Sequence, residues 1–183
     1  MSRLRDQLES GKFVVTTEMG PPKGTDLESF LATARFLKSK VDAVNVTDNQ
    51  RAVMRLSSVG GASHVAGVGL EPIVQVTCRD RNRLAIQSEL LSAWVLGVQN
   101  VLTMTGDPVE AGDHPKAKPV FDISSAELLR LIGRLNAGRD DAGHRLEGHP
   151  SFFCGATVNP CIDPLEPELK RFEEKVAAGA CFF

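Results

Sequence analysis

The chain has 183 residues, 42% of them hydrophobic, so its length and composition predict one domain with a well-filled core. The formal net charge of −2 and the scattered Lys and Arg argue against a nucleic-acid-binding surface. No apolar run approaches the roughly 20 residues of a membrane span. The N-terminal segment lacks the apolar core of a signal peptide, and residues 1–8 favour a short amphipathic helix instead.

Five short apolar runs, repeated about every thirty residues, each lead to a polar residue. The runs cover residues 13–17, 43–46, 73–76, 101–104 and 152–158. The polar residues that follow them are Glu18, Thr47-Asp48, Thr77, Thr105-Gly106-Asp107 and Asn159. Because segments with helical spacing separate the runs, the pattern predicts parallel βαβ units.

The segments between the runs have the features of helices. We expect helices over residues 27–37, 57–66, 82–96, 124–135 and 164–178. Thr25 or Asp26 is expected to cap the first of them. Ser124 and Glu127 have the spacing of a capping box, and Gly97 suits a helix C-terminus.

This alternation predicts an α/β fold, a (β/α)8 TIM barrel in a single domain over residues 1–183. The sequence supplies strands one to five and, at residues 180–183, the start of a sixth, so we expect a barrel truncated after five to six βα units. The N-terminal helix is expected to cover the barrel floor. Active sites of such barrels lie at the C-terminal strand ends. The irregular segment 108–122 is therefore expected to be functional, and the polar segment 136–150 to be a solvated insertion at the bottom face.

The cysteines and histidines show no metal-ligand spacing, so we expect no metal site. We expect reduced, buried thiols in a cytoplasmic protein, at Cys78, Cys154, Cys161 and Cys181. A disulfide or nucleophile pair formed by Cys154 and Cys161 is the less favoured alternative. His114 and His149 lie in loops and are interpreted as surface residues.

Two carboxylates carry the chemistry suggested by position. Glu18 follows an apolar run and precedes Met-Gly-Pro-Pro, which turns the chain sharply. A carboxyl group half shielded from water at a strand end can act as a general acid; the alternative is a solvated loop glutamate. Asp107 follows Gly106, which allows close approach of a ligand to the backbone. The alternative there is an ordinary Gly-Asp turn.

Further polar residues would surround the same rim. Thr47, Asp48, Gln75 and Thr77 offer hydrogen-bonding groups at neighbouring strand ends. Each taken singly is better explained by local loop hydrogen bonds. Together with Glu18 and Asp107, however, they place polar residues at four strand ends, which favours a site. The sequence contains no Walker loop, no GxGxxG after a strand and no HExxH motif.

Several motifs together resemble a known family. In strand order they are residues 17–24 (Thr-Glu-Met-Gly-Pro-Pro-Lys-Gly), 44–48 (Val-Asn-Val-Thr-Asp), 103–108 (Thr-Met-Thr-Gly-Asp-Pro), 113–122, 155–160 (Gly-Ala-Thr-Val-Asn-Pro) and 169–180. These motifs resemble those of the 5,10-methylenetetrahydrofolate reductase family. The resemblance covers essentially the whole chain, in order and at the family's spacing.

The resemblance implies a flavin-dependent enzyme of one-carbon and methionine metabolism. FAD would lie at the C-terminal mouth of the barrel and pass hydride from NAD(P)H to methylenetetrahydrofolate, giving 5-methyltetrahydrofolate. Glu18 would protonate the departing nitrogen, and Asp107 would stabilise the cationic iminium and touch the flavin. By family position, the flavin would be lined by Thr47, Asp48, Gln75, Thr105, Gly106, Asp107, Asn159 and Lys175.

The sequence also departs from the family pattern. Thr105 stands where many members have Arg, Gln75 where some have His, and Asn159 where some have Tyr. This is typical of a TGDP branch whose electron donor, NADH, NADPH or a protein, the residues leave open. The family's later strands lie beyond Phe183, so we expect a homo-oligomer or a second chain that supplies them. The alternatives are a catalytically silent or partner-requiring barrel fragment, and another pterin-binding barrel enzyme.

Overall fold

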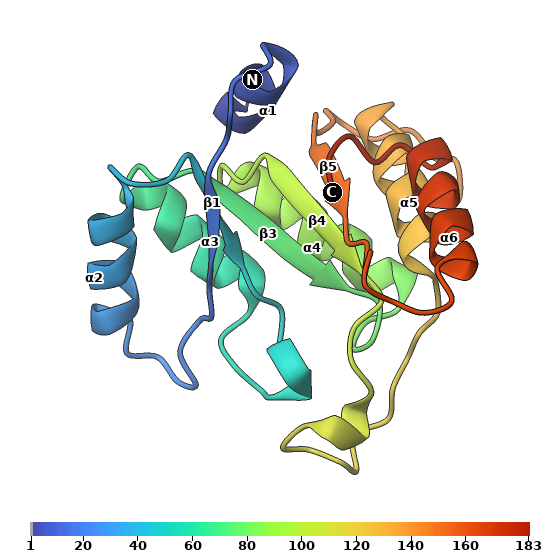
Figure 1. Ribbon diagram of the computed structural model, residues 1–183, viewed down its shortest axis with the longest axis horizontal. Helices are drawn as coiled ribbons and strands as arrows, with labels where there is room; N and C mark the ends of the chain where they lie inside the picture. The colour runs from blue at the N-terminus through green and yellow to red at the C-terminus, as the bar shows by residue number, and fades with distance from the viewer. Residues whose placement is uncertain (1) are drawn as a thin grey trace.

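The computed structural model describes residues 2–183, in which strands and helices alternate along the chain (Figure 1). The strands are β1 (Thr16–Met19), β2 (Ala43–Val46), β3 (Pro72–Thr77), β4 (Asn100–Met104) and β5 (Phe153–Ala156). The α-helices are α1 (Arg3–Glu9), α2 (Glu28–Leu37), α3 (Ser58–Gly67), α4 (Arg83–Val95), α5 (Ser125–Asn136) and α6 (Glu166–Ala177). Two 3-10 helices, η1 (Gln50–Ala52) and η2 (Val109–Ala111), follow β2 and β4.

The five strands form one parallel sheet in the order β1-β2-β3-β4-β5. Each strand lies beside its predecessor and is reached through a helix, which is the arrangement of a (β/α)8 barrel. The predicted fold class is therefore confirmed. At the far edge, a single parallel bridge joins Gly155 to Phe182, where the sequence predicts the start of a sixth strand.

Both faces of the sheet are buried, as is usual for parallel sheets. On the outer face, Val44, Val74 and Val101 pack with apolar side chains of the helices. On the inner face, Ile73 and Phe153 cluster with Leu4 of α1. Because side chains alternate along a strand, the residues directly before and after each of these valines point into the barrel interior.

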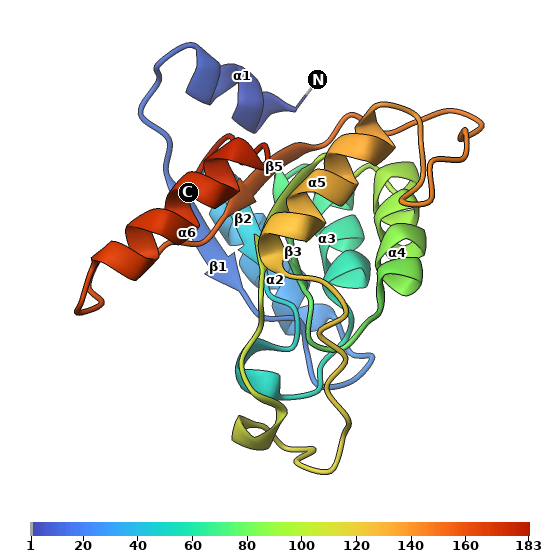
Figure 2. The ribbon, with the colours of Figure 1, turned by 90° about the vertical axis from the view of Figure 1, so that its right-hand side faces the viewer.

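Helix α1 lies beyond one end of the sheet, and η1 and η2 lie beyond the other (Figures 1 and 2). Ser2 caps α1 by accepting the Arg5 N–H at 3.1 Å and donates its hydroxyl to Glu71 at 3.0 Å. Buried Asn100 donates to the same Glu71 oxygen at 2.9 Å. These contacts fix α1 over the N-terminal ends of the strands, so the prediction that it covers the floor is confirmed.

The helix-end predictions from the sequence are largely confirmed. Ser124 and Glu127 form both halves of the capping box of α5. Gly97 has a left-handed φ of +87° just after α4. Asp26 accepts the Glu28 N–H at 2.9 Å at the start of α2, although the cap position itself is Leu27.

Two strand predictions need correction at their ends. The first strand begins at Thr16 rather than Phe13, so Glu18 lies within β1 and not after it. Pairing with β2 begins only at Thr16, because the preceding Val15 N–H donates to the side chain of Asp42. Phe13 is 86% exposed. The last strand is also shorter than predicted, since β5 ends at Ala156.

The prediction of buried thiols is half right. Cys78 and Cys154 are buried, whereas Cys161 and Cys181 are exposed, and all four are free. Burial raises the pKa of the Cys78 thiol to about 12 and raises the pKa of Cys154 as well. Both buried thiols are therefore poor nucleophiles. Within residues 2–183, no helix has the length and apolar character needed to cross a membrane.

Candidate functional site

A cavity of about 490 Å³ opens at the C-terminal ends of the strands. Its walls combine inward-facing strand residues with the loops that follow β2, β3, β4 and β5. The lining residues are Glu18, Asn45, Asp48, Gln50, Gln75, Thr77, Arg79, Leu102, Met104, Thr105, Gly106, Asp107 and Thr157. This is the end of a (β/α)8 barrel at which active sites form.

Glu18 projects from β1 into this cavity and is held by two side-chain amides. Gln50 donates to one carboxylate oxygen at 2.9 Å, and Gln75 donates to the other at 3.1 Å. The side chain is exposed, not half shielded as the sequence suggested, because the cavity is open to solvent on this side. The two amides fix the orientation of the carboxylate without neutralising its charge.

Asp48 is a buried carboxylate that links β2 to β3. Its Oδ2 atom accepts the Thr77 N–H at 2.8 Å and the Thr77 hydroxyl at 3.0 Å, and it also pairs with Arg81. Within residues 2–183, no hydrogen bond reaches the Oδ1 atom of Asp48. The second oxygen is therefore available to a ligand in the cavity.

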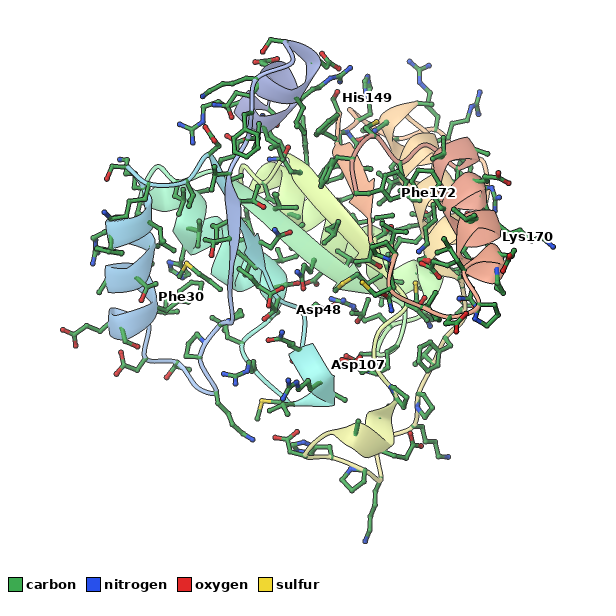
Figure 3. All side chains as sticks on the ribbon, in the orientation of Figure 1. Phe30, Asp48, Asp107, His149, Lys170 and Phe172 are labelled. Atoms are coloured by element: carbon green, nitrogen blue, oxygen red, sulfur yellow. The ribbon has the colours of Figure 1, made fainter. Side chains whose placement is uncertain are left out.

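Asp107 lies at the rim, directly after a glycine in the left-handed region. Gly106 has a φ of +96°, and a Cβ added to it would lie 3.0 Å from the Cβ of Arg79. Only glycine fits this turn without strain. Asp107 is exposed, and its Oδ2 accepts the Arg51 N–H at 3.0 Å. Figure 3 shows Asp48 and Asp107 near one end of the sheet and His149 at the opposite end.

Loop η1 is strained and needs contacts from its neighbours. Asn49, Arg51 and Ala52 have φ values of +45°, +56° and +55°. Each such residue costs about 1–3 kcal/mol unless its surroundings fix it. Here the backbone of the β4 loop packs so closely that a Cβ on Gly112 would lie 1.8 Å from the carbonyl oxygen of Ala52.

Asp113 joins three loops at the mouth of the barrel. It pairs with Lys23 from the β1 loop, accepts the Met54 N–H at 3.0 Å and contacts His114 Nδ1 at 2.8 Å. The hydrogen bond from Lys23, followed by those from Met54 and His114, holds the pKa of Asp113 well below its usual range. The loops after β1, β2 and β4 are thus tied into one rim.

The polar residues of the site that were missed by the sequence analysis include Gln50, Arg79 and Arg81. Arg79 is 1% exposed and pairs with Asp80, and its hydrogen bonds lower the pKa of Asp80. The available indication was the charged run Arg79-Asp80-Arg81, which comes shortly after an apolar strand. Nothing in the sequence indicated Gln50, because its contact with Glu18 depends on the course of η1.

The predicted site residues fall into two groups. Those that line the single cavity are Glu18, Asp48, Gln75, Thr105, Gly106 and Asp107. Those that do not line it are Thr47, Asn159 and Lys175. Thr47 is fully buried, and the side chain of Asn159 accepts the Cys161 N–H at 3.1 Å. Lys175 donates to the carbonyl of Thr157, itself a lining residue, at 2.6 Å.

The sheet and cavity define a (β/α)-barrel protein with a small-molecule site built from carboxylates and amides. The family model described as Methylenetetrahydrofolate reductase matches residues 3–183. The chain therefore belongs to the methylenetetrahydrofolate reductase family, as its motifs predicted. This membership gives it a methylenetetrahydrofolate reductase-type function.

Proposed function

We propose that the protein reduces 5,10-methylenetetrahydrofolate to 5-methyltetrahydrofolate, with FAD as cofactor and NAD(P)H as the hydride source, in one-carbon and methionine metabolism. One observation carries the proposal: Glu18, Gln75 and Asp107, from three strand ends, line the same cavity. We further propose that residues 1–183 act as one barrel domain. The four free cysteines support a reducing compartment such as the cytoplasm.

The cavity has features that fit a flavin. Its volume of about 490 Å³ lies within the range of small-molecule sites. Buried Asn45 Oδ1 has no hydrogen-bond partner within residues 2–183, so a ligand group would satisfy it. Asp48, Gln75, Thr105 and the backbone at Gly106 would hold the flavin. When bound, FAD would supply the hydride-carrying chemistry that side chains lack.

Three predicted cofactor contacts lie outside the cavity walls and are proposed on the family resemblance alone. Lys175 is the best placed of them, because its contact with Thr157 brings its ammonium group to the margin of the cavity. Asn159 lies on the same loop as Thr157, and Thr47 adjoins Asp48 in sequence. An ammonium group at this margin suits a phosphate or ribose.

Glu18 is proposed as the proton donor. Opening the five-membered ring of the folate breaks a carbon–nitrogen bond, and the departing nitrogen needs a proton. Glu18 faces the cavity with both oxygens oriented by Gln50 and Gln75. Its carboxyl group must first take up a proton from solvent, and the fixed orientation then suits transfer of that proton to the nitrogen.

Asp107 is proposed to stabilise the iminium that ring opening creates. The iminium is cationic, and a fixed carboxylate beside it lowers the energy of the charge-separated state. The Arg51 N–H holds one oxygen of Asp107, so the carboxylate is oriented before the substrate binds. This preorganisation avoids reorientation during the reaction.

The proposed function is tested first by flavin binding. The purified chain is incubated with FAD and desalted, and its visible spectrum is recorded; retained flavin bands are the expected result. NAD(P)H-dependent consumption of methylenetetrahydrofolate is then measured. A chain that stays colourless but binds folate would contradict the proposal and favour another pterin-binding barrel enzyme. A chain that binds neither would favour the silent barrel.

A further inference from the structure

Arg79 is a buried charge at the cavity for which the proposed mechanism gives no role. It follows β3 and is 1% exposed. Its Nε and Nη2 atoms each donate to a carboxylate oxygen of Asp80 at 2.7 Å. Asp80 therefore balances the charge, and a buried arginine paired in this way has a fixed position.

The remaining donors of Arg79 reach the backbones of two neighbouring loops. Nη2 donates to the carbonyl of Asn49, after β2, at 3.2 Å. Nη1 donates to the carbonyl of Asp107, after β4, at the longer distance of 3.4 Å. One guanidinium thus joins the ends of three consecutive strands across the wall of the cavity.

Both carbonyls belong to the proposed catalytic apparatus. One is the carbonyl of Asp107 itself. The other belongs to Asn49, the residue before Gln50, and Gln50 donates to Glu18. Since Asn49 has a left-handed φ of +45°, its conformation depends on contacts of this kind.

We propose that Arg79 is a positioning residue. Through its hydrogen bonds to the carbonyls of Asn49 and Asp107, it fixes the positions of the Glu18 and Asp107 side chains across the cavity. This inference rests on the proposed function of the two carboxylates.

Lysine cannot replace this arginine, because the contacts need a planar fork of donors. A guanidinium reaches Asp80 and both carbonyls at once, whereas an ammonium group is a compact point charge. R79K therefore keeps the positive charge but removes the planar fork of hydrogen-bond donors. R79Q serves as a second variant, and R83K is the matched control, since Arg83 also pairs with carboxylates but does not line the cavity.

The first measurement needs neither flavin nor folate. Hydrogen–deuterium exchange is followed in peptides covering residues 49–55 and 106–113. R79K and R79Q should raise exchange at least severalfold in both segments and leave β3 protected, whereas R83K should match the wild type. Unchanged exchange over residues 49–55 would overturn the proposal whatever the activity. This exchange measurement does not depend on activity. If the wild type lacks reductase activity, the proposed function fails, but the exchange data still test whether Arg79 holds the two loops.

The second measurement separates positioning from general destabilisation. R79K should lower kcat about tenfold or more and leave KM for the folate within about twofold. Q50A removes the contact to Glu18 on its own, so the double variant R79K/Q50A should be no worse than R79K. The proposal would be overturned if the losses of kcat in the two single variants multiplied in the double variant, or if the loss of kcat followed the fall in melting temperature. Either result would show a merely structural role.

Discussion

At the scale of single residues, the site depends on neutral partners for one carboxylate and backbone partners for the other. Glu18 is oriented by two glutamines, and Asp107 is oriented by the Arg51 N–H. Neither carboxylate is in an ion pair within residues 2–183. This arrangement suits an electrostatic stabiliser at Asp107 and, when its carboxyl group carries a proton, a proton donor at Glu18 acting on the same ligand.

E18Q tests the role of the proton donor. The amide keeps the size of the side chain but cannot protonate a departing nitrogen, so folate reduction should fall about 10²–10⁴-fold. Oxidation of NAD(P)H by an artificial electron acceptor needs no such proton and should stay within about twofold. Steady-state assays of both reactions measure the difference. E147Q, at an exposed position outside the cavity, is the control; equal losses in both reactions of E18Q would exclude the assigned role.

The sequence was a better guide to what lies on the strands than to what lies in the loops. Glu18, Gln75 and Asp107 could be predicted because parallel strands end at one edge and residue alternation decides which side chains point inward. Gln50 could not, because its contact with Glu18 depends on the left-handed path of η1. For Arg79, the charged run after β3 indicated the residue but not its contacts with distant loops. Asn159 shows the same limit, since its side chain caps its own turn instead of facing the cavity.

At the scale of elements, the loops after β1, β2 and β4 form one interlocked rim, while the helices follow local rules. The capping box of α5 was readable from Ser124 and Glu127 alone. The start of β1 was not, because Asp42 takes the Val15 N–H before the ladder begins. Local chemistry thus decides helix ends, and pairing between distant segments decides strand ends.

D113N tests the rim through its pH dependence. The lowered pKa of Asp113 means that its ion pair stabilises the fold above the unfolded-state pKa, near 3.9. This stabilisation is lost as the pH falls through the lower, folded-state pKa. D113N should therefore melt at a lower temperature than the wild type at pH 7, and the gap should narrow below about pH 4. Thermal melts across this range measure it, with exposed D6N as control; a constant gap would contradict the ion pair.

Two glycine substitutions should change stability in opposite directions. G112A places a methyl group against the backbone of Ala52 and should lower the free energy of unfolding by about 1–3 kcal/mol. G133A lies at an exposed position of α5, where no atom comes within 4 Å of the new Cβ, and should raise it by about 1 kcal/mol. Denaturant titration measures both values. A neutral G112A would mean that the two loops separate easily.

At the scale of the whole molecule, the floor and the mouth of the sheet have separate tasks. The floor holds α1 through Ser2, Glu71 and Asn100, and it holds the apolar cluster around Phe153. The mouth carries the cavity and the strained loops. The chemistry therefore depends on the mouth of the strands, whereas the floor contributes to stability alone.

F182A tests how strongly the last residues support the inner face. Phe182 stacks on Phe153 with ring centroids 5.2 Å apart and packs against Gly155, which has no side chain. Removing the ring should lower the free energy of unfolding by about 2 kcal/mol. F13A, at a position 86% exposed, should change it by less than about 0.5 kcal/mol. Equal effects in denaturant titrations would mean that Phe182 does not support the fold.

The polar turn between α5 and β5 has a practical consequence. Glu147 and Gly148 are exposed and lie at the floor, beside His149 and away from Asp107 (Figure 3). Exposed turns of this kind accept added sequence more readily than paired backbone does. A peptide tag or a fluorescent label inserted there would leave the cavity open, so the protein could be immobilised or tracked while its chemistry is measured.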